Sequence, residues 1–472
     1  MKNIIKYFLL FLILSQLSFL YSQQNIDGKW HGSILLSGSD LEMFVTFKTD
    51  PDSLRATIDI PVQGAKDLKL IHCSQSADKV HFELQAFSLA VFDGHFSNDS
   101  IVGDFTQSIY TGTFYLVRGE KKIEQPKDTV ALPYKEEEVT YYNGDIKFAG
   151  TLTLPKTGGK HPAVVMITGS GAQNRDEEIF GFKIFRIIAD ALTRKGIAVL
   201  RTDDRNVGGS TDNSVSGGTT EEFAGDVKQA VKFLKTRDDI DPAQIGLFGH
   251  SEGGIIAPMV ASQSDDIAFI ILMAGTGVKG IDILKEQSRL IILASGGTDK
   301  DADDNNAALE KAYMCLNTDT GWDELQVMVE NTIKNNYDKM TDAQKESIKD
   351  LNEYSKSMAK LQVTQMRSPW MKYFMVYDPE PALEKVKCPV LMLFGENDLQ
   401  VPPKQNREPM ENALKKGGNK DYKIVIIPKA NHLFQACDSG NPENYTKLPK
   451  EFAPGFLDTI TSWALNHVTV TK

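Results

Sequence analysis

The chain has 472 residues, of which 41% are hydrophobic and 24% are charged, so it is long enough for two or three folded domains. Its 52 basic and 63 acidic residues give a formal net charge of −11, and no basic cluster interrupts this acidic background. Such a chain is not expected to bind nucleic acid or an anionic membrane surface.

The first 22 residues have the pattern of a secretory signal peptide. Lys2 and Lys6 form a basic start, residues 7–14 form an apolar core, and Leu20-Tyr21-Ser22 is suited to cleavage. The apolar run is shorter than the ~20 residues of a membrane-spanning helix. No cysteine lies near the cleavage point to carry a lipid anchor. We therefore expect an exported protein, periplasmic or extracellular after removal of residues 1–22, with no stable membrane insertion.

Residues 25–118 predict an all-β domain, either a small barrel or a sandwich. Short apolar or alternating segments recur at even intervals, separated by turn residues, at 30–35, 43–47, 56–60, 80–84 and 113–116. No cluster of catalytic residue types lies among them. A packing module is the favoured interpretation, and a domain that captures an apolar ligand or a glycan is the alternative.

Residues 119–138 have no apolar period and are interpreted as a linker. The following segment, 139–472, contains short continuous apolar runs at 163–167, 197–200, 245–248, 269–273, 389–394 and 424–427. Strands that are buried on both faces have this pattern, and helical segments lie between most of them. The segment therefore predicts an α/β domain with a mostly parallel sheet covered on both faces.

One connection in this domain is unusually long. The 109 residues from 279 to 387 separate two predicted strands and are polar and helix-rich. A structureless loop of that length is implausible inside a domain, so a helical cap is expected. Near its end, Trp370 and Phe374 belong to an aromatic segment, and they are candidates for the substrate pocket or for the core of the cap.

The strongest chemical motif is Gly249-His250-Ser251-Glu252-Gly253. An apolar run precedes it and a small-residue, apolar segment follows it, so the motif predicts a strand, a tight turn and a helix. This turn presents the Ser251 hydroxyl above the sheet and directs the first N–H groups of the helix toward a group bound to it. We interpret Ser251 as a nucleophile.

A serine nucleophile needs a base, and the base needs an acceptor that holds its tautomer. His432 directly follows the last apolar strand and is preferred as the base over His467, which lies five residues from the end. Asp398 follows the preceding strand and is preferred as the acid, with Glu396 as its nearest rival.

An oxyanion formed at Ser251 needs two N–H donors. The first is expected from Glu252, and the second from the loop after the first buried strand. In that loop Ser170 is the preferred donor, with Gly171 as the alternative.

These motifs together resemble the α/β-hydrolases, in particular the bacterial secreted-esterase and serine-aminopeptidase-like group. The matching stretches are 169–176, 203–210, 249–254, 368–370, 386–390, 395–402 and 431–435. The resemblance implies an α/β-hydrolase fold and a Ser-His-Asp triad, and it says less about the substrate. Thr168 replaces a usual histidine and Asn206 a usual glycine. We expect Arg205 and Asp204 to shape the second of these loops by ion pairing.

The sequence therefore predicts an exported serine hydrolase that cleaves a small carboxylic ester, with no metal and no organic cofactor. An aminopeptidase-like activity is the alternative, for which the acidic run at 299–304 would have to bind a substrate ammonium. A further alternative is hydrolysis of glycan- or lipid-linked esters captured by the amino-terminal domain. The four cysteines lie far apart and show no metal-ligand spacing, and neither their pairing nor the oligomeric state follows from the sequence.

Overall fold

The computed structural model describes residues 25–36, 39–51, 53–60, 65–85, 89–97, 99–107, 110–119, 132–212, 218–339, 345, 348 and 350–470. The chain divides into two compact units, Met1–Ile60 with Asp67–Ile123, and Pro61–Lys66 with Glu124–Lys472. The expected signal peptide, residues 1–22, lies outside the described residues.

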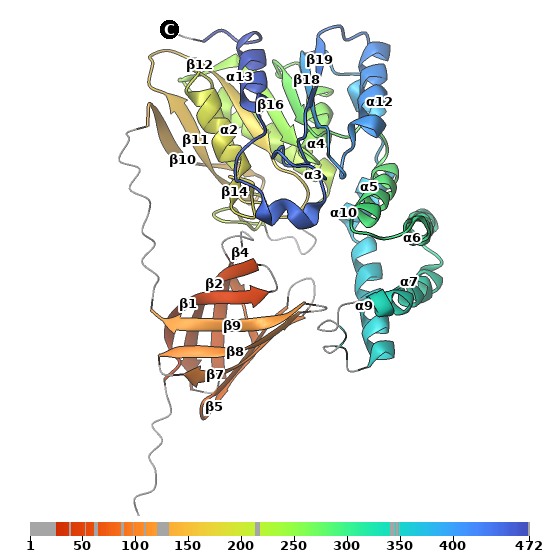
Figure 1. Ribbon diagram of the computed structural model, residues 1–472. Coiled ribbons are helices and arrows are strands. Elements are labelled where there is room, and N and C mark those ends of the chain that lie inside the picture. The colour runs from red at the N-terminus through yellow and green to blue at the C-terminus, as the bar shows by residue number, and fades with distance from the viewer. Residues whose placement is uncertain are drawn as a thin grey trace, which may run out of the picture. The chain divides into compact units, whose positions relative to one another are not determined.

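The first unit is an antiparallel β-sheet of nine strands (Figure 1). In chain order these are β1 (Gly28–Leu36), β2 (Ser39–Asp50), β3 (Ser53–Ile60), β4 (Ala65–Lys69), β5 (Ile71–Ser76), β6 (Lys79–Gln85), β7 (Leu89–Ser97), β8 (Ser100–Gln107) and β9 (Tyr110–Arg118). Their order in the sheet is β4-β3-β2-β1-β9-β8-β7-β6-β5. The Leu70 N–H, just before β5, donates to the Ala56 carbonyl of β3 at 2.9 Å. This bond brings the two ends of the sheet together, so the predicted all-β domain is a nearly closed barrel.

Aromatic side chains fill the interior of this barrel. Phe82 stacks on Phe92 with ring centroids 4.6 Å apart, and Phe114 meets both rings edge-on. Phe47 and Phe105 complete the cluster at 5.5 and 5.0 Å. Alternate residues of the strands point inward, so a strand pattern of period two places these rings on one face. The described interior is a packed core.

The second unit is built on an eight-stranded sheet. Its strands are β10 (Tyr134–Asn143), β11 (Ile146–Pro155), β12 (His161–Ile167), β15 (Ala198–Thr202), β16 (Ile240–His250), β17 (Ile270–Met273), β18 (Val390–Gly395) and β19 (Tyr422–Ile427). The order is β10-β11-β15-β12-β16-β17-β18-β19. The pairs from β15 to β19 are parallel, and β10-β11 and β11-β15 are antiparallel. The predicted mostly parallel sheet is confirmed.

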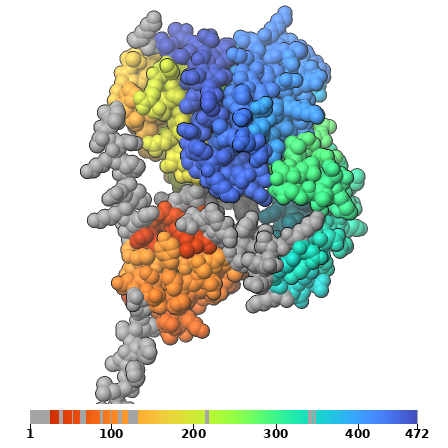
Figure 2. All heavy atoms as spheres, viewed as in Figure 1, coloured from red at the N-terminus to blue at the C-terminus, as the bar shows by residue number. Residues whose placement is uncertain are grey.

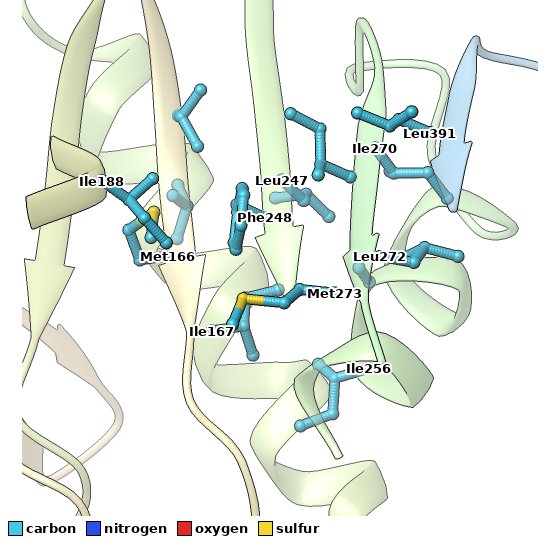
Figure 3. Packing of buried hydrophobic residues seen from close by; sticks show 14 of the residues in the cluster. Met166, Ile167, Ile188, Leu247, Phe248, Ile256, Ile270, Leu272, Met273 and Leu391 are labelled. Atoms are coloured by element: carbon cyan, nitrogen blue, oxygen red, sulfur yellow. The ribbon is translucent and has the colours of Figure 1, made fainter. Parts of the chain in front are cut away.

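Helices cover both faces of this sheet. α2 (Ile184–Thr193) and α13 (Phe456–Leu465) contact each other on one face, and α3 (Thr220–Lys235) and α4 (Gly253–Ala261) contact each other on the opposite face (Figure 1). α12 (Pro403–Lys416) lies between β18 and β19 in the chain, and β13 (Glu178–Ile179) pairs with β14 (Phe182–Lys183). Figure 3 shows side chains of the central strands packed together with Ile188 of α2 and Ile256 of α4. This buried core fixes the strand ends on which the site is built.

The long connection between β17 and β18 is helical, as predicted. It contains α5 (Gly280–Ala294), α6 (Asp299–Thr318), α7 (Trp322–Asn336), η2 (Tyr337–Lys339), α9 (Leu351–Met366), α10 (Pro369–Val376) and α11 (Glu380–Leu383). α5, α6, α7, α9 and α10 share a small hydrophobic core of their own. The Asn441 amide donates to the Ala294 carbonyl at 3.2 Å, and the green atoms of α5 border the blue carboxyl-terminal segment, which includes η3 (Pro442–Lys447), in Figure 2.

Two boundaries differ from the prediction. The expected linker, 119–138, ends in the sheet, because β10 begins at Tyr134. Charged residues at 135–138 hide this strand, since they are exposed at the sheet edge while Tyr134, Val139 and Tyr141 are buried. The expected cap, 279–387, also includes α11, which contacts α4 and α12 of the hydrolase layer and therefore belongs to that layer.

Candidate active site

Ser251 lies in a strained turn between β16 and α4. Its φ angle is +52°, a left-handed conformation that is uncommon for a residue with a side chain. The Ser251 N–H donates to the Met273 carbonyl of β17 at 2.9 Å, which holds the turn. A Cβ atom at Gly253 would lie 2.2 Å from the Ile167 carbonyl oxygen, so only glycine fits there. The predicted strand, tight turn and helix are confirmed.

Asp398 and His432 form a buried pair. Nδ1 of His432 lies 2.8 Å from Oδ2 of Asp398, and the side chains are 6% and 0% exposed. The other carboxylate oxygen, Oδ1, accepts the N–H groups of Gln400 at 2.7 Å and Val401 at 2.9 Å. Because a carboxylate accepts at Nδ1, the proton of neutral His432 is held there, and Nε2 is the nitrogen suited to accept a proton.

The two loops that carry this pair approach each other closely. A Cβ atom at Gly395, the last residue of β18, would lie 2.5 Å from the carbonyl oxygens of both Ala430 and Asn431. The Asn431 side chain accepts the N–H groups of Leu433 and Gln435, each at 2.9 Å, and so shapes the histidine loop. Glycine at the strand end therefore permits the approach on which the pair depends.

The rival residues have other contacts. Glu396 accepts the Lys429 N–H at 2.8 Å, and His467 bonds the Trp463 carbonyl at 2.8 Å near the end of α13. Of the rival acids, it is Asp398 that the structure pairs with His432. Burial tends to raise the pKa of Asp398, but His432 and the two N–H donors hold that pKa below its usual value. The carboxylate is therefore ionised at neutral pH.

The loop after β12 lies against Ser251. A Cβ atom at Gly169 would be 3.3 Å from the Ser251 Cβ. The Gly169 N–H donates to Oε1 of Glu177 at 2.7 Å, so this amide is engaged and Ser170 supplies the next one. Glu252 occupies the N-cap position of α4, and its side chain makes no capping hydrogen bond there. The expected oxyanion donors, Ser170 and Glu252, thus belong to the two segments on either side of this contact.

The Glu252 side chain joins the turn to the helical insertion. Its Oε1 accepts the Thr220 hydroxyl at 2.7 Å and the Trp370 indole N–H at 2.8 Å. Burial raises the pKa of Glu252, and hydrogen bonds from Thr220, Trp370 and Ser170 oppose that rise. Trp370 stacks on Phe374 with centroids 5.2 Å apart, and Phe374 is itself buried in the core. The structure thus places Trp370 in contact with the residue after Ser251 and Phe374 against Trp370.

Comparison with known proteins identifies the family of the chain. The family model described as alpha/beta hydrolase fold matches residues 162–436, more than half of the chain. The chain belongs to the alpha/beta hydrolase family.

Individual relatives cover the chain to different extents. Esterase EstD of Thermotoga maritima is 26% identical over 372 residues, covering 78% of this chain and 76% of the relative. Thiohydrolase aneE of Aspergillus aculeatus is 33% identical over 145 residues, or 31% of this chain and 42% of the relative. Among solved structures, the Pyrococcus furiosus esterase PF2001 aligns with a TM-score of 0.43 and 15% identity over 75% of this chain and 96% of that one.

Two departures from the alpha/beta hydrolase pattern have clear structural consequences. Thr168 donates its hydroxyl to Asp204 at 2.8 Å, and Asp204 also accepts the Gln173 N–H at 2.9 Å, so Asp204 holds both sides of the loop after β12. Asn206 has φ +61°, which asparagine tolerates better than most residues. Asp204 shapes this loop through these hydrogen bonds and not through the expected ion pairing.

Arg205 instead forms ion pairs with Asp226 at 2.7 Å and with Asp212 at 3.5 Å. Asp204 has no cationic partner among the described residues, and burial raises its pKa to about 8, against the hydrogen bonds from Gln173 and Thr168. The expected ion pairing is thus confirmed for Arg205 and wrong for Asp204.

The sequence analysis missed two further polar residues of the site, Glu177 and His250. Nδ1 of His250 lies 2.9 Å from Oε1 of Glu177, and Nε2 lies 3.1 Å from the carbonyl oxygen of His432. His250 precedes Ser251 in the recognised motif, which was a signal that it lies at the site. Glu177 gave no comparable signal, because 73 residues separate it from His250.

Proposed function

We propose that this alpha/beta hydrolase is an exported serine hydrolase that cleaves carboxylic esters through Ser251, His432 and Asp398. The observation that carries the proposal is the buried 2.8 Å pair of His432 and Asp398 on the strand ends that also carry the strained Ser251 turn. Nucleophile, acid and base thus come from three loops of one sheet edge, in the chain order typical of this fold.

In the proposed reaction Ser251 attacks the ester carbonyl while Nε2 of His432 takes its proton. Asp398 holds the imidazole in the required tautomer and stabilises the imidazolium that forms. The N–H groups of Glu252 and Ser170 donate to the oxyanion. His432 then protonates the leaving alcohol and later activates the water that hydrolyses the acyl-enzyme.

The esterase name of the Thermotoga relative, which covers most of both chains, supports the choice of ester substrates. The aminopeptidase alternative gains no support from the acidic run at 299–304. Asp301 caps α6 through Thr298, Asp299 pairs with Arg289, and Asp304 pairs with Lys300. The packed aromatic interior of the barrel likewise does not favour capture of a ligand inside it.

Export and the cap belong to the same proposal. The basic and apolar pattern of residues 1–22 supports a signal peptide. No described helix combines the length and the apolar character needed to cross a bilayer. The bond from Trp370 to Glu252 supports a cap role for the helical insertion, because it joins α10 to the residue after the nucleophile.

Replacing the nucleophile tests the mechanism. We expect Ser251→Ala to lower kcat for p-nitrophenyl acetate by ~10⁴-fold or more and to abolish labelling by a fluorophosphonate, with an unchanged melting temperature. Ser262→Ala, a serine just after α4, is the control and should keep full activity. Hydrolysis that survives Ser251→Ala in protein free of contaminating esterases would contradict the mechanism. Turnover of amino-acid p-nitroanilides above that of the esters would favour the aminopeptidase alternative.

A further inference from the structure

The ring of His250 is enclosed between two acceptors. It is 2% exposed, with the Glu177 carboxylate at Nδ1 and the His432 carbonyl oxygen at Nε2. A carbonyl oxygen accepts and cannot donate, so Nε2 must carry a proton to make its bond. The contact between Nδ1 and Oε1 of Glu177, at 2.9 Å, also contains one proton. When that proton is on Nδ1, His250 is a buried imidazolium paired with a buried carboxylate.

A second buried histidine shows the contrast. His161, at the start of β12, is also 2% exposed, and its Nε2 also lies 3.1 Å from a carbonyl oxygen, that of Thr157. Its Nδ1 has no hydrogen-bond partner in the described part of the chain. One ring nitrogen of His161 thus has a hydrogen-bond partner, whereas both ring nitrogens of His250 have one. Burial opposes a charged ring, but the Glu177 carboxylate raises the pKa of His250 above its usual value.

The pair connects three segments around the nucleophile. Oε1 of Glu177 bonds both the Gly169 N–H and His250, so a single oxygen joins the loop after β12 to the residue before Ser251. From His250 the connection continues to the backbone of His432, and the two imidazole rings lie 4.9 Å apart. Each of these segments carries one part of the proposed machinery.

We propose that the Glu177–His250 ion pair is a positioning element that sets the Gly169–Ser170 amides and the His432 backbone relative to Ser251. This inference rests on the proposed function, since it assigns a purpose to the distances among the proposed catalytic parts. Both side chains are buried, so the proposed role is exerted through the groups that they hold. The pair acts because reaction rates fall steeply when catalytic groups are misplaced, by as much as ~10²-fold for a shift of 1 Å.

The protonation state can be measured on the unmodified protein. With histidine labelled with ¹⁵N, both ring nitrogens of His250 should show the chemical shifts of protonated imidazolium at pH 7. His161 should show one protonated and one unprotonated nitrogen. A neutral tautomer at His250 would overturn the proposal, and this measurement does not depend on the activity of the enzyme or on the folding of a variant.

The positioning role is tested with Glu177→Gln, which keeps the size of the side chain and removes its charge. We expect kcat per titratable Ser251 to fall by ~10²-fold, with KM within ~3-fold of wild type. His161→Gln is the matched control, because it replaces an equally buried histidine. His161 lies at the start of β12, about 20 Å along the strand from the end that leads into the Gly169 loop. It should leave kcat per titratable site unchanged even if the melting temperature falls.

The double variant Glu177→Gln with His250→Gln removes both charges and so leaves no unpaired charge in the core. Because the two residues act as one unit, the double variant should lose about as much kcat as Glu177→Gln alone or His250→Gln alone. A loss equal to the product of the two single losses would overturn the proposal. So would an unchanged kcat per titratable site in Glu177→Gln with only the melting temperature lowered, which is the signature of a structural pair.

If Ser251→Ala retained activity, the proposed function would fail, while the ring-nitrogen result would stand.

Discussion

The site contains two buried carboxylate–imidazole pairs that differ in what lies at the second ring nitrogen. In both, Nδ1 faces a carboxylate, at 2.8 Å for His432 and 2.9 Å for His250. The Nε2 of His250 is bound to a backbone carbonyl, whereas the Nε2 of His432 is the nitrogen suited to proton transfer. The same two side-chain types thus serve two purposes, and the second contact of the imidazole decides which. In the proposed mechanism, one proton moves and the other stays.

Breaking the first pair should have the largest effect. We expect Asp398→Asn to lower kcat for a nitrophenyl ester by ~10⁴-fold, because the amide no longer holds His432 in the required tautomer. Circular dichroism should show a folded protein. The control is Glu396→Gln, the nearby rival carboxylate that binds the Lys429 N–H, and its kcat should stay within ~2-fold. A larger loss from Glu396→Gln than from Asp398→Asn would reverse the assignment of the acid.

A third carboxyl group, that of Glu252, accepts hydrogen bonds from neutral donors. Removing one of these hydrogen bonds should have a moderate effect on activity. Trp370→Phe keeps the aromatic ring beside Phe374 and removes only the indole N–H. Loss of one such hydrogen bond, about 1–2 kcal/mol, should lower kcat/KM by roughly tenfold. Trp322→Phe is the control, because Trp322 also donates to a carboxylate, Asp319 at 3.2 Å, on the exposed side of the insertion.

Equal losses in the two tryptophan variants would show that Trp370 acts through the general stability of the insertion. If Trp370 lines the acyl pocket, as the sequence suggested, the preference between acetate and octanoate esters should also shift in Trp370→Phe. A uniform loss at every chain length would remove Trp370 from the pocket and leave it as a link to Glu252.

Asp204 is a buried carboxyl group that is not paired with an imidazole in the described part of the chain. Its contribution to the stability of the fold should depend on pH. Its pKa in the folded protein is about 8, raised by burial and by nearby Glu177 and Glu252, whereas its ordinary value is 3.8. Between these values the folded state retains a proton that the unfolded chain has lost. The stability linked to this proton is therefore fully present below about pH 4 and is lost as pH rises through about 8.

Asp204→Asn mimics the protonated acid and should remove this component. Between pH 5 and pH 9 the melting temperature of wild type should fall more steeply than that of Asp204→Asn, with kcat at pH 6 changed by less than ~3-fold. Differential scanning calorimetry at several pH values measures the two slopes. Parallel slopes would mean that Asp204 is ionised in the folded protein.

The smallest effect is expected from removing the amino-terminal unit, because both histidine pairs lie in the second unit. A chain that starts at residue 132 includes the whole of β10 and should hydrolyse p-nitrophenyl acetate within ~2-fold of the full-length rate. A chain that starts at Val139 would lose half of β10 and should be less stable. Failure of the longer version to fold would show that the hydrolase unit depends on the barrel.

Much of the fold could be predicted because buried parallel strands and short antiparallel strands have different local patterns. Continuous apolar runs marked the central strands, and alternating residues marked the barrel. β10 was missed because it lies at the edge of the sheet, where charged side chains at 135–138 are exposed and the apolar pattern is interrupted. The turn at Ser251 could be predicted because its glycines and its serine are consecutive in the chain.

What the sequence determined by itself is therefore local: which segments form strands and helices, where the turn with Ser251 lies, and that His432 and Asp398 follow adjacent strands. Only the tertiary structure decided which polar groups meet, since 34 residues separate Asp398 from His432, 73 separate Glu177 from His250, and 118 separate Glu252 from Trp370. The order of the strands and the close approach of their loops set these contacts. Neither is encoded in the pattern of any one segment, because each depends on how all the buried strands pack together.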